Sequence, residues 1–372
     1  MTPKERMLCA YRGLPADRMP VAPEFWYYYP AKILGMDMIA FEKDIPFWKA
    51  LQSAFQKFKC DGWGAYWFPS ANPNIKTVTS LKDIGGGRFR EDTSSVYRGK
   101  TFTSVRILDK EEPSWNEKNI ADNIEDLRDV IEMALDEGAV LDYADAEKAL
   151  NTVGGDYLLE MWLGAPFFDF IAMHTGFENA VMYFNSAPEK EIETFRQRLT
   201  EERISYIRKV CANTGFESFV FGCAYSCNSL IGPHMWRKWD KPFLKAVADE
   251  IHRHGKLLHI HFHGRSLDAV ADFPEIGIDC VCPFERGPGG DVDGLAGLKE
   301  VRKRLNEKVT MNGNVHTVET LIRGNTADVR REVREIKEAF SGSNRCIIGT
   351  GDQVGRETPE ENIAAMIEEA VK

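Results

Sequence analysis

The chain has 372 residues, of which 43% are hydrophobic and 28% charged, so a large hydrophobic core is available and wholesale disorder is excluded. Its 47 Lys and Arg residues against 57 Asp and Glu residues give a formal net charge of −10, which argues against non-specific binding to nucleic acid or to an anionic membrane. The eight cysteines are scattered, and no apolar signal or membrane-spanning segment stands out. We therefore expect a cytoplasmic protein with reduced thiols, whose partners are small molecules or proteins.

The N-terminal half of the chain predicts a helix, several strands and one interruption. A helix is expected to begin at Pro3, because Thr2 can cap it and proline is favoured in a first turn. Residues 76–110 break the rhythm with short alternating runs, which are typical of a small antiparallel sheet. Other strands are expected over 21–26, 64–68 and 157–162.

From residue 188 onward, helical and strand patterns alternate five times. Strands separated by helices imply right-handed βαβ units and a parallel sheet. With eight strand candidates in all, a closed (β/α)8 barrel is favoured over an open sheet, and we expect residues 1–372 to form a single barrel domain with an antiparallel insertion near residues 76–110. The expected helices are 188–212, 235–254, 267–273, 295–305, 327–340 and 359–371, and the expected strands are 217–222, 256–261, 278–283, 309–313 and 345–349.

The glycine-rich segments do not predict a nucleotide site. Residues 85–87 and 287–290 both lack the setting of strand, turn and helix that a phosphate-binding loop needs.

Three histidines alternate along one predicted strand and just beyond its end. His259, His261 and His263 therefore point to the same face. Active sites of barrels form at the C-terminal strand ends, so His261 and His263 stand where a metal or a substrate would bind, whereas His259 is most simply a core histidine. Two partly buried imidazoles side by side are costly unless they share a proton or a cation.

Further donor side chains follow other strands. Cys223, Glu285, His316 and Asp352 each come directly after a predicted strand. Nitrogen, oxygen and sulfur donors in such a ring suit zinc, which keeps one position open when it is catalytic. The alternatives are a buried thiol for Cys223 and an ion pair for Glu285. Cys280 and Cys282 lie in an apolar run and are most simply small buried hydrophobic residues.

Several motifs, spread over nearly the whole chain, resemble one known family. The most specific are His-Phe-His-Gly at 261–264, Pro-Phe-Glu at 283–285 and Gly-Thr-Gly-Asp at 349–352, and the others lie at 2–6, 18–21, 164–167, 221–223, 313–315 and 358–362. Together they resemble the uroporphyrinogen decarboxylase superfamily, and within it the cobalamin-dependent methyltransferase branch that includes the methanol and methylamine:coenzyme M methyltransferases. The resemblance implies a (β/α)8 barrel, in agreement with the strand count.

The resemblance also implies a zinc site. In that branch zinc is held by His-x-Cys-Gly and by a cysteine after a later glycine, and the matching positions here are His261, His263 and Asp352. Both thiolates are thus replaced by nitrogen and oxygen donors, which still bind metals. We expect zinc on these three residues, with Cys223 or Glu285 as a fourth ligand and with Glu285 and His316 as candidate catalytic groups. The decarboxylase itself is less similar, because its arginine-rich N-terminal segment is here aromatic.

The ligand types favour one chemistry. Histidine and carboxylate ligands leave a harder ion than thiolates do, which suits an oxygen-containing substrate. We hypothesise a zinc-dependent methyltransferase that moves a methyl group between a small-molecule donor, for example a methoxylated aromatic, and the corrinoid (cobalamin) of a partner protein. Candidate substrate-binding residues are Glu24, Trp26, Tyr27 and Trp67, although the aromatic rings would serve equally to pack the insertion.

Two other functions stay open at this point. One is a metal-free decarboxylase-like lyase of the same superfamily, with histidines as general acids. The other is a non-catalytic corrinoid- or tetrapyrrole-binding protein. The sequence leaves the oligomeric state open, with a homodimer as one option.

Overall fold

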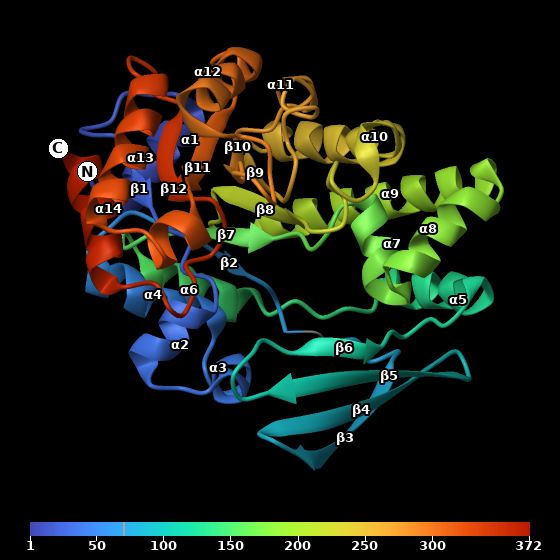
Figure 1. The fold of residues 1–372 in the computed structure, drawn as a ribbon. Coiled ribbons are helices and arrows are strands. Elements are labelled where there is room, and N and C mark those ends of the chain that lie inside the picture. The colour runs from blue at the N-terminus through green and yellow to red at the C-terminus, as the bar shows by residue number, and fades with distance from the viewer. Residues whose placement is uncertain (70) are drawn as a thin grey trace.

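Eight parallel strands form one curled sheet in the computed structural model, which describes residues 1–69 and 71–372 (Figure 1). The strand order is β1-β12-β11-β10-β9-β8-β7-β2, which is the chain order of a (β/α)8 barrel with β1 and β2 at the two edges of the sheet. The predicted parallel eight-stranded fold is confirmed. The strands are β1 (Val21–Ala22), β2 (Trp63–Tyr66), β7 (Leu158–Trp162), β8 (Ser218–Cys223), β9 (Leu257–Phe262), β10 (Cys280–Pro283), β11 (Thr310–Val315) and β12 (Cys346–Thr350).

Side chains link the two edges of this sheet. The Val21 backbone N–H in β1 donates to Asp61 Oδ2 at 2.9 Å, and Asp61 lies just before β2. The rings of Trp26 and Trp63, which follow β1 and begin β2, are 5.3 Å apart. Because β1 has only two residues, these contacts hold the edges together where strand pairing is short.

Helices connect the strands and cover the outside of the sheet. Five of the six helices predicted from residue 188 onward begin and end within three residues of the observed helices, and Thr2 caps the first helix of the chain as expected. The helices are α1 (Pro3–Arg12), α2 (Tyr28–Leu34), α3 (Met38–Asp44), α4 (Phe47–Phe58), α5 (Ile124–Ala134), α6 (Tyr143–Val153), α7 (Phe167–Thr175), α8 (Phe177–Ser186), α9 (Glu189–Asn213), α10 (Gly232–Arg253), α11 (Phe273–Ile276), α12 (Gly294–Leu305), η1 (Thr317–Ile322), α13 (Thr326–Ala339) and α14 (Glu360–Val371). In residues 1–69 and 71–372, none of these helices has both the length and the apolar composition of a membrane span.

One predicted helix is wrong. Residues 267–272 form turns, and only the short α11 follows. The Ser266 and Leu267 backbone N–H groups donate to Asp291 Oδ1 at 2.9 and 3.2 Å, which fixes the chain in a turn at the point where the helix was expected to begin.

The insertion forms a separate antiparallel sheet. Its strands are β3 (Lys76–Gly85), β4 (Arg88–Tyr97), β5 (Lys100–Asp109) and β6 (Trp115–Lys118), so it extends past the predicted end at residue 110. Figure 1 shows this sheet below the barrel, with β3 at its far edge. Every residue of β3 is exposed, whereas β5 buries Phe102, Val105 and Ile107.

The barrel has two cores on the two faces of its sheet. One lies between the sheet and the helices and includes Phe219 and Phe221 of β8. The other fills the barrel interior and includes Val220 of β8, Cys282 of β10 and Tyr11 of α1. Alternate residues of one strand therefore face different cores, as the pleat of a strand requires.

Candidate functional site

The candidate site lies at the C-terminal ends of four strands. Because all eight strands are parallel, residues at or just after their last positions meet at one end of the barrel. These residues are Glu24 after β1, His261 in β9 and His263 after it, Cys282 in β10, Glu285 after β10, and Asp352 after β12.

His261, His263 and Asp352 form what we call the outer set. Each offers one ligand atom, and these three atoms lie within 4.8 Å of one another. The two Nε2 atoms of the histidines are 2.8 Å apart. The sequence prediction thus named three side chains that the fold brings together.

Glu285 orients His263 from behind. Its Oε1 lies 2.9 Å from Nδ1 of His263 and also accepts the Gly264 backbone N–H at 3.0 Å. Burial raises the pKa of Glu285, but these hydrogen bonds outweigh it and the pKa is lowered. Burial likewise opposes the raised pKa of His263, which comes from Glu285 and Asp352. A carboxylate that holds Nδ1–H of a histidine turns Nε2 toward a metal. Glu285 therefore acts as a positioning residue in this geometry.

Asp352 adopts a backbone conformation that is rare for a residue with a side chain. Its φ is 143°. The Thr350 hydroxyl donates to its carbonyl oxygen at 2.6 Å, and the Gln353 N–H donates to its Oδ1 at 2.6 Å. Burial raises the pKa of the Asp352 carboxyl, although His263 acts in the opposite direction. Strained backbone of this kind persists where the surrounding structure enforces it, and it gathers at functional sites.

A second group, the inner set, shares His261 and consists of Glu24, His261 and Cys282. Nδ1 of His261 lies 3.0 Å from Cys282 Sγ and 3.6 Å from Glu24 Oε2. Burial lowers the pKa of His261 well below its usual value, with His263 and His259 adding to the effect. Burial also raises the pKa of Glu24 well above its usual value, with Asp352 and Glu285 contributing.

The structure corrects the interpretation of Cys282 as a small hydrophobic residue. Its sulfur also lies 3.1 Å from Nε2 of His259, so it stands between two imidazole rings. In the β9–β10 ladder Cys282 is level with His261. The pairing register of two strands is not readable from one sequence, which is why the contact was missed.

His259 is a core histidine, as predicted. Its Nδ1 lies 2.9 Å from Glu160 Oε2 and 3.1 Å from the Tyr11 hydroxyl, and the ring is completely buried. The Ser218 hydroxyl donates to the other oxygen of Glu160 at 2.6 Å. This network fixes the ring below the inner set.

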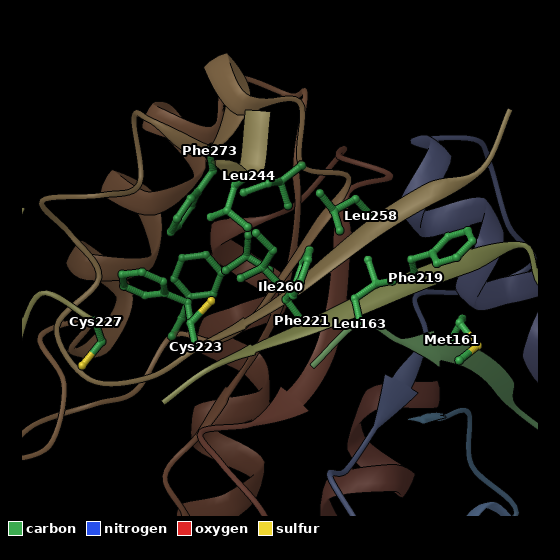
Figure 2. Close-up of a cluster of buried hydrophobic side chains, with 14 of the residues drawn as sticks. Met161, Leu163, Phe219, Phe221, Cys223, Cys227, Leu244, Leu258, Ile260 and Phe273 are labelled. Atoms are coloured by element: carbon green, nitrogen blue, oxygen red, sulfur yellow. The ribbon is translucent and has the colours of Figure 1, made fainter. Parts of the chain in front are cut away.

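The expectation that Cys223 is a metal ligand is corrected by its place in the fold. Figure 2 shows Cys223 among Phe221, Leu244 and Phe273 in the core outside the sheet. The β8–β9 register places Gly222, not Cys223, level with His261. Cys223 therefore faces away from the barrel interior, and it belongs to neither donor set.

His316 is also placed in a structural role. Its Nδ1 accepts the N–H groups of Val318 and Glu319, both at 3.2 Å, so it caps η1. Its Nε2 lies 3.0 Å from the Gly287 carbonyl oxygen, to which it donates. With both ring nitrogens engaged, His316 has no free nitrogen for the catalytic proton transfer that we expected.

The aromatic residues divide between core and cavity. Trp26 packs against Phe47, with ring centroids 4.7 Å apart, as well as against Trp63. Tyr27 and Trp67 line a cavity of about 590 Å³ between the barrel and the insertion, whose other walls include Phe47, Glu42 and Arg106. Neither donor set lines this cavity, and Glu24 joins the inner set rather than the predicted substrate site.

The comparison with known families identifies the class of protein. Residues 103–372 match the model of the uroporphyrinogen decarboxylase (URO-D) family, which is well over half of the chain. The chain therefore belongs to the uroporphyrinogen decarboxylase family, and the predicted resemblance is confirmed.

Its relatives are methyltransferases by name. The methylcobamide:CoM methyltransferase MtbA of Methanosarcina acetivorans is 22% identical over 378 residues, which cover 99% of this chain and 97% of the relative. The protein of the same name from Methanosarcina mazei is 21% identical over the same shares. A solved structure, a methyltransferase from Methanosarcina mazei, is 15% identical with a TM-score of 0.65 over 99% of this chain and 98% of the other, and it shows the same fold.

Proposed function

We propose that this protein is a zinc-dependent methyltransferase that exchanges a methyl group with the corrinoid of a partner protein in the cytoplasm. The observation that carries the proposal is the outer set, in which His261, His263 and Asp352 converge at the mouth of the barrel. The names of the curated relatives support methyl transfer with a corrinoid.

The outer set fits a zinc ion. Two imidazoles and a carboxylate are the ligands of many catalytic zinc sites, in which a fourth position stays open. Nδ1 of His263 is held by Glu285 and Nδ1 of His261 lies against Cys282, so both rings present Nε2 to the same point. When bound there, zinc would supply Lewis acidity to an oxygen or sulfur atom of the reacting molecule.

The protein side chains would orient the ligands and exclude water. Glu285 fixes the ring of His263, and the strained loop at Asp352 aims a carboxylate at the same point. The rings of Trp63 and His261 lie 5.9 Å apart, so an apolar wall stands beside the donor atoms. Apolar surface that excludes water strengthens the charge interactions among the donor atoms at this end of the barrel.

The aromatic cavity supports a methoxylated aromatic as the small-molecule donor. Tyr27 and Trp67 offer flat apolar surface for a ring. The Tyr27 N–H donates to Gln353 Oε1 at 3.4 Å, and Gln353 is the neighbour of Asp352 in the chain. This hydrogen bond thus joins the cavity wall at Tyr27 to the loop that carries Asp352.

Metal analysis tests the proposal first. Protein purified without chelator should hold about one zinc per chain, and His263→Ala should lose most of it. The matched control is His252→Ala, which removes a half-exposed histidine that pairs with Asp279 on the outside of α10. Loss of zinc in both variants, or a wild-type protein that binds no zinc even after zinc is added, would contradict the proposal.

An assay of methyl transfer to cobalamin tests the proposed activity. Wild-type protein loaded with zinc, reduced cobalamin and a methoxylated aromatic should form methylcobalamin, which is followed by its visible spectrum. His263→Ala should reduce the rate by at least about 100-fold, because a ligand is lost. Release of carbon dioxide from a porphyrinogen without added metal would instead identify the lyase.

A further inference from the structure

The two donor sets lie on opposite sides of one imidazole ring. His261 faces His263 through Nε2, at 2.8 Å, and faces Cys282 and Glu24 through Nδ1, at 3.0 and 3.6 Å. A neutral imidazole offers one lone pair, so a single ion bound to His261 lies on one side or the other. The inner side carries its own complete mixture of nitrogen, oxygen and sulfur donors.

Glu24 is the observation that points to a cation on the inner side. Its side chain is buried, with 6% of the residue exposed. Within residues 1–69 and 71–372, no N–H or O–H group donates a hydrogen bond to its carboxylate, and the basic atom that faces it is Nδ1 of His261, 3.6 Å from Oε2. A buried carboxylate without a donor is costly, and a bound cation removes that cost.

Cys282 completes the charge balance. Its sulfur is buried in the barrel interior and lies within 4.8 Å of donor atoms of both Glu24 and His261. One carboxylate, one thiolate and one divalent cation sum to zero charge, which is the state that a buried position tolerates best. Thiolate and imidazole together select zinc and similar thiophilic ions rather than magnesium or calcium.

We propose that Glu24, Cys282 and Nδ1 of His261 form a second metal position, deeper in the barrel than the outer set, for a thiophilic divalent cation. Binding releases the thiol proton of Cys282 and the carboxyl proton that burial favours on Glu24 to solvent, and the thiolate and carboxylate bond to the metal in their place. The proposal rests on the proposed function only in sharing His261, and the inner and outer positions are alternatives for an ion on that residue, because a neutral His261 has one lone pair to give. It places a soft ligand in this chain although both cysteine positions of the family motif have been replaced.

The test is a titration of the metal-free full-length protein with Co²⁺, which reports a thiolate ligand as a charge-transfer band in the near ultraviolet. The wild-type protein should show the band. It should vanish in Cys282→Ser, and in Glu24→Gln the apparent Co²⁺ affinity should fall by at least about 10-fold. The matched control is Cys280→Ser, because Cys280 lies two residues earlier on the same strand, is equally buried and belongs to neither set.

Asp352→Asn separates this proposal from the proposed function. If the charge-transfer band persists in Asp352→Asn and methyl transfer is absent even in the wild-type protein, the inner position stands and the proposed function fails. If wild-type protein binds Co²⁺ without the band, and Asp352→Asn abolishes that binding, the inner position is overturned and the outer set stands. A band that survives in a folded Cys282→Ser variant would also overturn it, and the wild-type and Glu24→Gln spectra decide the matter if Cys282→Ser does not fold.

Discussion

Gly222 leaves room for the ring of Trp162, which lies against β8. It stands level with His261 in the β8–β9 ladder, and a Cβ atom at this position would meet the Trp162 ring at 2.6 Å. The Trp162 ring in turn lies 6.2 Å from Trp26, so it has neighbours on its other side. Any side chain at position 222 must therefore displace the Trp162 ring.

Gly222→Ala should accordingly lower the free energy of unfolding by about 1–3 kcal/mol, the usual cost of overpacking a core. Urea denaturation measures it. The matched control is Gly215→Ala, where the nearest atom to a new Cβ is 3.5 Å away. Equal losses in the two variants would show that space beside Trp162 is not what requires glycine.

A buried pair of aspartates, Asp169 and Asp240, should make the stability of the protein depend on pH. Asp169 Oδ1 accepts the N–H groups of Tyr225 and Ser226 at 2.7 and 2.6 Å, and Asp240 Oδ1 accepts the Phe168 N–H at 2.9 Å. Oδ2 of each aspartate is buried, and within the described part of the chain it has no hydrogen-bond partner. Burial and the charge of Asp240 raise the pKa of Asp169, and burial raises the pKa of Asp240.

These raised values mean that the folded state binds more protons than the unfolded state. Stability should therefore fall as pH rises above the unfolded carboxyl pKa of about 4 and through the raised folded values. Asp240→Asn removes one of the two buried charges, so it should stabilise the protein by about 1 kcal/mol at pH 8 and by less at pH 5.

Thermal unfolding at the two pH values tests this prediction. Asp249→Asn is the control, because Asp249 is on the same helix but half-exposed and paired with Lys245 at 2.5 Å. A gain that is the same at pH 5 and pH 8, or no gain at all, would contradict the assignment of the pH dependence to the buried pair.

Among the elements, α1 closes the N-terminal end of the barrel. It buries Met7 and Tyr11 in the interior core, and its first turn is held by a reciprocal pair of hydrogen bonds. The Glu5 N–H donates to Thr2 Oγ1 at 3.2 Å, and the Thr2 N–H donates to Glu5 Oε2 at 2.8 Å. The cap therefore helps to hold α1, and with it Tyr11, in place against His259.

Thr2→Ala should lower the free energy of unfolding by about 0.5–2 kcal/mol, the usual cost of a lost N-cap, whereas Thr2→Ser should restore most of it. Chemical denaturation of the three proteins measures the difference. If the serine variant is as unstable as the alanine variant, the methyl packing of Thr2 rather than its hydroxyl supports α1.

The elements also show what a single sequence can and cannot predict. All eight barrel strands were predictable, because apolar runs alternate with helical periodicity, whereas the turns at 267–272 depend on Asp291, which is distant in sequence. The two cysteines show the limit for the site. Cys223 was a candidate because it follows a predicted strand, but the β8–β9 register decides its face, and a single sequence does not show that register. The structure places Cys282 in the barrel interior and Cys223 in the core outside the sheet.

On the scale of the whole molecule, the donor atoms connect distant parts of the chain. Glu24 follows β1 near the N-terminus, Asp352 follows β12 near the C-terminus, and His261 comes from β9 between them. Since β1 pairs with β12 over only two residue pairs, a metal ion at the mouth would add a link beside this short pairing. The metal position should accordingly govern the stability of the whole barrel, not of one loop.

Zinc should therefore raise the melting temperature of the metal-free protein, and the rise should grow with zinc concentration. An ion that binds only the folded state adds about 2.7 kcal/mol at 100 times its dissociation constant. His261→Ala removes the one ligand that both donor sets share, so it should abolish the zinc-dependent rise, whereas His254→Ala, on the outside of the barrel, should keep it. Magnesium, which prefers six oxygen ligands, should have no comparable effect. Scanning calorimetry at several zinc concentrations measures this, and an undiminished rise in His261→Ala would mean that zinc binds elsewhere and that neither donor set holds it.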